Sequence, residues 1–364
     1  MKRVFVAALV AALIVAYYRR RATKRVREVV MVVSRGQETP EEEAAVSRMV
    51  KEGRNYFERN VVMGKLHGRG NLTLQYGVLR SNMEDEKGLV LFLPGWSESM
   101  IKYADFLKEL NELGYTVVAL DHRSQGYSSR SPRTLVDEYD HIKTHVEDFH
   151  DLLTDALLVY HEVALPLCLD GKSFKLMGFS IGGLVATHLS TMIKCDSLIL
   201  VSPCLQPLIG AYPPWLLQLL TRALRALGRG EHFFPGPPPE KSFGLLMPPH
   251  SRVSSSSARV RYWQGLREEQ SVLCVNGMSV AQFDEILGAR PTPQSARRVL
   301  AKQVLLLSAE LERFVENEAI FRFADHLPSH ITCRHVHIRG AKHELLQERE
   351  EIRGRALDEI KAFL

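Results

Sequence analysis

Short apolar runs rich in β-branched and aromatic residues alternate along the chain with longer stretches of helical periodicity. The runs predict strands at residues 71–79, 88–93, 115–120, 174–179, 197–201, 304–307 and 335–338. Helical periodicity predicts helices at residues 102–113, 146–163, 184–193, 316–326 and 345–363. Because strand and helix alternate, we expect an α/β fold with a mostly parallel sheet and helices on both of its faces.

An earlier helix is predicted by its start signal. Thr39 is an N-cap residue, Pro40 suits the first helical position, and Glu42 completes a capping box. The helix is expected to run to about Glu58.

Residues 205–298 break the alternation of strands and helices. Proline and serine are abundant there, and no convincing strand pattern is present. A stretch this long between strands predicts an inserted helical cap, so we expect an α/β domain over residues 28–364 with the cap at about 205–298. A leucine stripe in the cap is interpreted either as plain packing or as a guide for an acyl chain or a membrane contact. The stripe consists of Leu216, Leu217, Leu219, Leu220, Leu224 and Leu227, beside Trp215.

Residues 4–18 form an uncharged and almost wholly apolar run. As a helix the run would cover roughly 22 Å, against about 30 Å for a bilayer core, so flanking tyrosines and arginines would supply the rest. A cleaved signal peptide and a buried helix are the alternatives, but a signal requires a small-residue cleavage site where this run meets Tyr17, Tyr18 and Arg19. We expect residues 1–27 to be an uncleaved hydrophobic membrane anchor with a basic flank. The denser positive charge after the run places the body on the cytoplasmic side.

Charge changes this picture in one respect. The net charge is +5, from 47 basic and 42 acidic residues, which suggests an acidic partner. Residues 1–30 hold eight of the basic residues and one acidic residue, so the remainder, with 39 basic and 41 acidic residues, lacks the basic surface of a nucleic-acid binder. Five scattered cysteines without metal-site spacing fit a reducing compartment.

Gly178-Phe179-Ser180-Ile181-Gly182 follows a predicted strand and opens a predicted helix. A serine on such a sharp strand-to-helix turn projects its hydroxyl above the sheet, which is how a nucleophile is presented on this architecture. A glycine-rich turn without chemistry is the alternative. We expect Ser180 to be the nucleophile.

A serine nucleophile requires a base and an orienting carboxylate, which follow on this architecture in the order Ser, acid, His. His343 lies between the last predicted strand and the last helix, and we expect it to be the base. Glu312 follows the strand at 304–307 by one short loop, whereas Glu316 begins a helix, where a first-turn acid is favourable in itself. Glu312 is the expected acid and Glu316 the alternative.

The oxyanion of an acyl-transfer reaction requires preorganised N–H donors. The backbone N–H of Ile181, just after the nucleophile, is one candidate. The second is expected in the loop after the strand at 88–93, where Pro94 has no N–H and Trp96 does.

Several segments together resemble the α/β-hydrolase-fold serine hydrolases, in the group that contains lysophospholipase L2, monoacylglycerol lipase and the serine aminopeptidase domain. The resemblance extends from about residue 88 to the C-terminus. Monoacylglycerol lipases usually have His-Gly in place of Pro94-Gly95 and aspartate in place of Glu312, and the group commonly has glycine at Ser124. The Pro-Gly opening and the glutamate-rich acid segment resemble lysophospholipase L2. The segments are residues 93–99 followed by Lys102-Tyr103, residues 121–126, 178–182 and 305–313, and residues 340–344.

The resemblance implies hydrolysis of carboxylic esters of single-chain lipids through an acyl-enzyme, with lysophospholipids first and monoacylglycerols second. Such a mechanism requires no metal and no organic cofactor. Two alternatives remain open: a serine aminopeptidase, and an inactive, membrane-tethered hydrolase-like binding protein. The expected partners are a lipid ester and, through the N-terminal segment, a membrane, but no nucleic acid.

Overall fold

A computed structural model describes residues 29–30, 38–82, 84, 86–130, 140–168, 171–208, 212–235 and 251–364. The membrane anchor expected over residues 1–27 lies outside these ranges. Within them, no helix combines the length and apolarity that a bilayer crossing requires.

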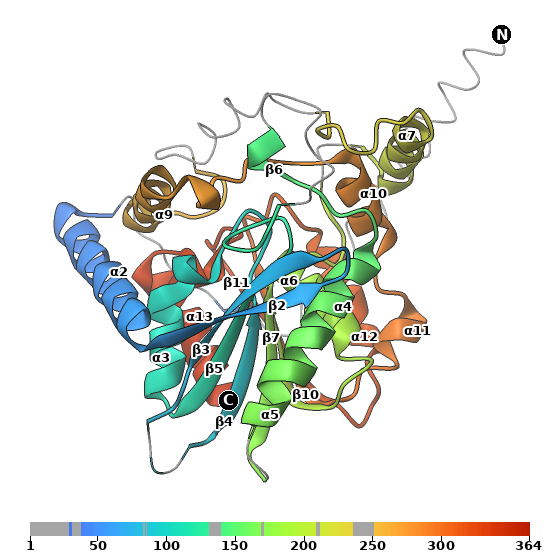
Figure 1. Cartoon of the computed structure of the whole chain (residues 1–364). Coiled ribbons are helices and arrows are strands. Elements are labelled where there is room, and N and C mark those ends of the chain that lie inside the picture. Colours follow the sequence, from blue (N-terminus) through green and yellow to red (C-terminus); the bar gives the residue numbers. More distant parts are fainter. Residues whose placement is uncertain are drawn as a thin grey trace.

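A nine-stranded sheet forms the centre of the described chain, in the order β1-β11-β10-β8-β7-β4-β5-β3-β2 (Figure 1). Neighbouring strands pair in parallel from β1 through to β5, while β3 pairs antiparallel with both β5 and β2. The predicted mostly parallel sheet is thus confirmed. The strands are β1 (Val29–Val30), β2 (Val61–Gly68), β3 (Leu72–Leu79), β4 (Gly88–Leu93), β5 (Tyr115–Asp121), β7 (Ser173–Phe179), β8 (Cys195–Val201), β10 (Ala301–Ala309) and β11 (Thr332–Ile338).

Alternate residues of the central strands enter two separate cores, one on each face of the sheet. In β4, Leu91 and Leu93 pack on the side of α4, α6 and α12, whereas Val90 and Phe92 pack on the side of α3 and α13. Both faces are therefore apolar, which explains why these strands read as continuous hydrophobic runs. The helices are α3 (Ala104–Glu112), α4 (Phe149–Val159), α6 (Ile181–Leu189), α12 (Asn317–His326) and α13 (Glu350–Phe363).

The first described helix, α2 (Pro40–Asn60), begins at the predicted capping box. The Thr39 hydroxyl accepts a hydrogen bond from the Glu42 N–H, and the Glu42 side chain accepts one from the Thr39 N–H. Strand β2, which follows directly, was not predicted. Its sequence contains Gly64, Lys65 and His67, and it lies at the edge of the sheet, where only one neighbour has to be satisfied.

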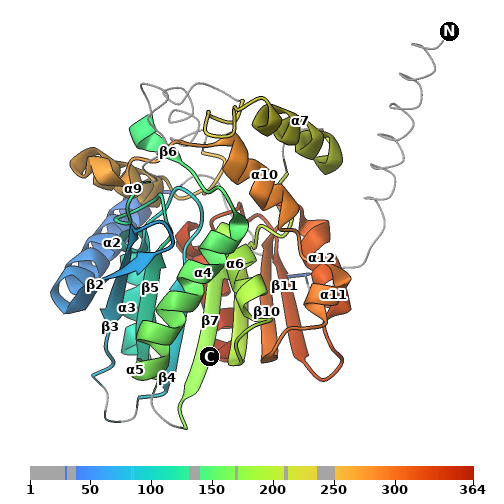
Figure 2. The ribbon, with the colours of Figure 1, turned by 45° about the vertical axis from the view of Figure 1, so that its right-hand side comes forward.

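The expected cap interval contains four α-helices among its described residues: α7 (Pro214–Ala226), α9 (Ser257–Glu269), α10 (Val280–Gly288) and α11 (Pro293–Ala296). It is not free of strands, because β9 (Gly277–Met278) pairs in parallel with β6 (Lys143–Thr144) in a second, two-stranded sheet. This interval meets the loops that follow β4 and β11: Ser97 Oγ donates to Val275 O (2.5 Å), and the Glu344 N–H donates to Val253 O (2.8 Å). Helices α7, α9 and α10 all lie beyond one end of the central sheet, with α7 beside α10 and α9 on the other side, near α2 (Figures 1 and 2).

Candidate active site

Ser180 lies on a tight turn between β7 and α6, with φ 51° and ψ −117°. A non-glycine residue adopts a positive φ at an energetic cost that the surrounding structure has to offset. Two backbone hydrogen bonds help to hold the turn: the Ser180 N–H donates to Val201 O (3.1 Å), and Ser180 O accepts from the Cys204 N–H (2.8 Å). The serine is therefore fixed at the carboxyl end of the central strands.

Two glycines permit this turn because any side chain would collide with nearby backbone. A Cβ at Gly178 would lie 2.4 Å from Gly182 O, and a Cβ at Gly182 would lie 2.1 Å from Leu93 O. The second contact also brings the start of α6 against the end of β4. The Gly-x-Ser-x-Gly spacing thus follows from the packing of this turn.

His343 reaches Ser180 from the loop between β11 and α13. Its Nε2 lies 3.0 Å from Ser180 Oγ, and its Nδ1 lies 2.7 Å from Glu312 Oε2. The rings of Phe179 and Phe314 contact the imidazole, with centroids 5.1 and 5.2 Å away. The structure thus brings together the three residues that the sequence analysis selected as nucleophile, base and acid.

The structure places the two competing glutamates differently. Glu312 Oε1 accepts hydrogen bonds from the N–H groups of Arg313 and Phe314, both at 2.8 Å, while its other oxygen faces His343. Glu316 instead occupies the N-cap position of α12 and lies 3.6 Å from Arg322. Of the two carboxylates, it is the Glu312 group that contacts the imidazole.

Glu312 and His343 shift each other's pKa in the direction that favours the charged form of each group. Burial alone would lower the pKa of His343, but the charge and hydrogen bond of Glu312, together with the charges of Glu344 and Glu98, outweigh it, so the pKa lies above its ordinary value of 6.5. Burial would raise the pKa of Glu312, but His343 and the backbone N–H donors hold it below 4.5. Because an ionised carboxylate only accepts hydrogen bonds, Nδ1 carries the proton and Nε2 of the neutral ring accepts from the serine hydroxyl.

The two expected oxyanion donors lie on adjacent segments. Ile181 is the first residue of α6, so its N–H has no acceptor within the helix. Trp96 lies in the loop after β4, which Gly182 contacts. The indole N–H of Trp96 donates to Thr144 Oγ1 (2.8 Å), so the backbone N–H is the group that Trp96 has to offer an oxyanion.

A buried lysine beside the site was not assigned a role from the sequence. Lys102 Nζ lies 2.7 Å from Glu98 Oε1 and 2.7 Å from Glu344 Oε1. Glu98 in turn accepts from the Gly95 N–H and from the Tyr103 hydroxyl, both at 2.7 Å. One cation therefore joins the loop after β4 to the loop that bears His343.

Lys102 keeps its charge in this position. Burial would lower the pKa of Lys102, but the carboxylates of Glu344 and Glu98 raise it above 10.5. Its ammonium group also lies 5.7 Å from the Trp263 ring of α9. The i, i+4 spacing of Glu98 and Lys102 was a signal of their pairing, but such a pair on a helix is usually an exposed one.

The arrangement has the parts that acyl transfer needs: a hydroxyl, a base in contact with it, a carboxylate that orients the base, and two N–H donors nearby. The sequence also matches a known protein family. The profile of the family described as "Serine aminopeptidase, S33" matches residues 84–350.

The chain is also similar to two bacterial proteins over most of their length. The chain is 23% identical to a probable lysophospholipase L2 of Haemophilus influenzae, over 82% of this chain and 90% of the relative. It is 27% identical to lysophospholipase L2 of Escherichia coli K12, over 78% of this chain and 82% of the relative.

Two monoacylglycerol lipases are among the similar structures. A soluble variant of the Saccharomyces cerevisiae monoglyceride lipase aligns with a TM-score of 0.65 at 14% identity, over 83% of this chain and 94% of that one. The Paleococcus ferrophilus monoacylglycerol lipase aligns with a TM-score of 0.58 at 20% identity, over 80% and 98%. These likenesses show an α/β-hydrolase fold.

Proposed function

The chain is an ester-hydrolysing enzyme of the family described as serine aminopeptidase, S33, and we propose that it cleaves the carboxylic esters of single-chain lipids. Lysophospholipids are the first substrate class and monoacylglycerols the second. The observation on which the chemistry rests is the unbroken contact from Ser180 through His343 to Glu312. The names of the two bacterial relatives, which align over most of their length, support the lipid class.

In the first step, Ser180 Oγ attacks the ester carbonyl carbon while His343 Nε2 takes the hydroxyl proton. The carbonyl oxygen becomes an oxyanion and accepts hydrogen bonds from the N–H groups of Ile181 and Trp96. The tetrahedral intermediate then collapses, and His343 returns the proton to the departing alcohol oxygen of the head group. The product is an acyl-enzyme on Ser180.

In the second step, water attacks the acyl-enzyme while His343 takes one of its protons. Collapse of the second intermediate returns a proton to Ser180 Oγ and releases the fatty acid. Glu312 holds the imidazole in one tautomer and stabilises the imidazolium that forms in both steps.

Cleavage of peptides is the less favoured alternative. An aminopeptidase needs a carboxylate that is free to receive the ammonium group of the substrate. Glu98 and Glu344, which lie close enough to raise the pKa of His343, are both paired with Lys102. These two carboxylates are therefore poorly suited to that task.

A membrane location completes the proposal. The apolar run at residues 4–18 and its basic flank support an uncleaved anchor, with the catalytic body on the cytoplasmic side. Deleting residues 1–27 is expected to release most of the active body from membranes. A truncated protein that still sediments with membranes as fully as the whole chain would refute this role for the N-terminal segment.

The decisive experiment incubates the purified chain with lysophospholipids, monoacylglycerols and an aminoacyl amide, and measures the products released. We expect fatty acid from the single-chain lipids, fastest from a lysophospholipid, and none with Ser180→Ala. Release of amino acid but no fatty acid would establish the peptidase. A folded chain that cleaves none of them and does not react with a fluorophosphonate would establish the inactive binding protein.

A further inference from the structure

Helix α7 turns an apolar face outward. At 100° per residue, the positions Trp215, Leu219, Leu216, Leu227 and Leu220 fall on one side of the helix and its C-cap. Their side chains are 53, 62, 37, 77 and 46% exposed, respectively. The only other residues on this side, Ala223 and Ala226, are also exposed and apolar.

The inward side of α7 holds polar groups as well as apolar ones. Leu217 packs against Phe283 and Leu287 of α10. On the same side, Thr221 Oγ1 donates to Asp284 (2.7 Å), and Arg225 contacts Asp284 and Glu285 at 3.0 and 2.6 Å. These bonds fix the rotation of α7, so the outward leucines cannot be buried by a simple roll of the helix.

The charged residues within α7 carry one sign. Residues 214–226 contain two arginines and no acid. Arg225 is engaged inward, whereas Arg222 lies at the edge of the apolar face and Arg229 follows its end, and both side chains are exposed. Tyr212, 63% exposed, precedes the helix. An apolar face with tyrosine and tryptophan at one end and arginines at its border is the composition of helices that lie in a membrane interface.

We propose that the outward face of α7 inserts into the interface of an anionic phospholipid bilayer. The leucines and Trp215 enter the boundary between head groups and acyl chains, while Arg222 and Arg229 remain among the anionic head groups. This contact is separate from the N-terminal segment, and it orients the catalytic body by a helix of the cap interval. The membrane contact extends the proposed function. Of the measurements below, only those of enzyme activity depend on that function being correct.

Tryptophan fluorescence tests the contact directly in the full-length chain. The chain has three tryptophans, and Trp96 and Trp263 are half-buried within the protein. Vesicles of phosphatidylcholine and phosphatidylglycerol are prepared with and without bromine atoms on the acyl chains, which quench tryptophans that reach them. We expect brominated vesicles to quench the bound protein, and Trp215→Phe to lose that quenching. Bound wild-type protein without quenching, or equal quenching of Trp215→Phe, would overturn the proposal.

Charge substitutions provide the second test. In the Leu219→Glu/Leu220→Glu variant we expect loss of Trp215 quenching and about tenfold slower release of fatty acid from vesicle-borne substrate, because the carboxylates resist insertion. Hydrolysis of a water-soluble short-chain ester should remain unchanged. Met192→Glu, at a site that is 50% exposed after the far end of α6, is the matched control and should behave as wild type.

The same variants separate the other outcomes. If the wild-type chain forms a dimer in sedimentation velocity, the double variant is monomeric and quenching is absent, then α7 binds a second copy and the proposal is wrong. If the soluble ester is not cleaved while Trp215 is quenched, the proposed function fails and the membrane contact stands.

Discussion

The charges around His343 and those around Arg259 are both buried, yet they are built for different tasks. Around His343, a carboxylate faces an imidazole that takes up and returns a proton in the reaction, and the imidazole faces a hydroxyl. Around Arg259, carboxylates face guanidinium groups, which stay charged at every physiological pH. The comparison teaches that burial and charge alone do not mark a catalytic site; a titratable base in contact with a nucleophile does.

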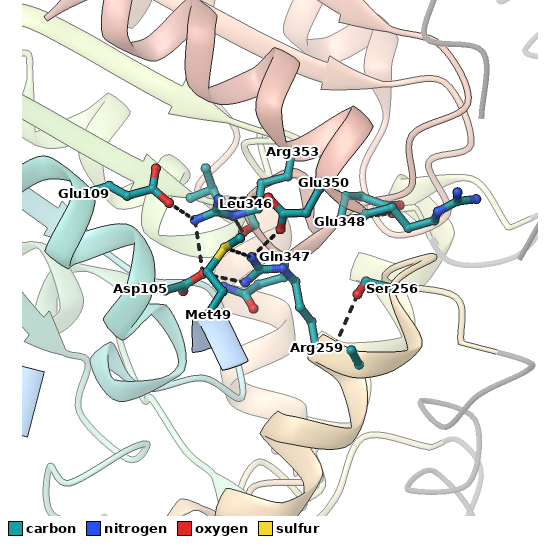
Figure 3. A network of polar contacts seen from close by, with 12 residues as sticks. Met49, Asp105, Glu109, Ser256, Arg259, Leu346, Gln347, Glu348, Glu350 and Arg353 are labelled. Carbon is teal, nitrogen blue, oxygen red and sulfur yellow. Dashed lines mark hydrogen bonds and ion pairs between the residues drawn. The ribbon is translucent and has the colours of Figure 1, made fainter. Parts of the chain in front are cut away.

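The Arg259 cluster links α3, α9 and α13 through ion pairs (Figure 3). Arg259 of α9 lies 2.6 Å from both Asp105 of α3 and Glu350 of α13. Arg353 of α13 lies 3.1 Å from Asp105 and 2.6 Å from Glu109. Burial would raise the pKa of Asp105, but the two arginines hold it below 3.8. The cluster therefore ties a helix of the cap interval to the hydrolase body.

The largest effect expected is on catalysis at the His343 cluster. Glu312→Gln keeps the shape but removes the charge that stabilises the imidazolium, so kcat should fall by about 10⁴-fold with little change in the unfolding temperature. Glu316→Gln, the matched control, should retain most activity. If only Glu316→Gln is inactive in steady-state assays with a soluble ester, the acid has been assigned wrongly.

The next effect concerns stability at the Arg259 cluster. Asp105→Asn leaves two buried arginines without their shared carboxylate, and the free energy of unfolding should fall by about 3–5 kcal/mol. The protein that remains folded should turn over substrate at nearly the wild-type rate. Asp358→Asn, at an exposed position of α13, controls for the substitution itself in urea titrations. A stable Asp105→Asn variant without activity would place this cluster in the catalytic machinery.

Lys102 is a permanently paired buried cation, like those of the Arg259 cluster, but it lies beside the catalytic residues. Lys102→Met frees the loop after β4 from the His343 loop and should lower kcat by about 10²-fold, as loss of oxyanion stabilisation does. The carboxylates of Glu98 and Glu344 raise the pKa of His343, so removing their cation raises it further. Catalysis needs neutral His343, so the acid limb of the pH profile, above pH 6.5 in the wild type, should move to higher pH. Lys102→Arg should recover part of the rate; an unchanged profile would contradict a role for Lys102 beside His343.

The smallest expected effect compares an exposed ion pair with a buried one on the same helix, α9. Glu269 of α9 pairs with Arg54 of α2 at 2.8 Å, but its side chain is 57% exposed. Glu269→Gln should lower the free energy of unfolding by less than about 1 kcal/mol, because solvent screens such pairs. A loss in urea titrations as large as that of Asp105→Asn would mean that exposure does not separate the two pairs.

The central strands and the nucleophile turn were predictable from the sequence, because their physics is local. The fully buried parallel strand β4 and residues 198–201 of β8 are continuous apolar runs, and the turn at Ser180 requires glycines at fixed offsets. His343 was selected by chain order and by its place between the last predicted strand and the last predicted helix. The identity of the acid was not decidable, since Glu312 and Glu316 both follow the same strand and only the fold brings one of them to the imidazole.

The charged clusters were not predictable because their partners lie far apart in the chain. Asp105 and Arg259 are separated by 154 residues, and each reads locally as an ordinary helix-surface residue.

Ser124 occupies a position whose backbone conformation favours glycine. The related group commonly has glycine there, and the structure supplies the reason: Ser124 has φ 66°, in the left-handed region that glycine adopts at least cost.

The most direct test of the account is covalent labelling of the full-length chain with a fluorophosphonate, followed by peptide mass mapping. The account predicts a single phosphonylated site at Ser180, with labelling slowed strongly in Glu312→Gln and absent in Ser180→Ala. Labelling that persists in Ser180→Ala, or a folded wild-type chain that never reacts, would contradict it.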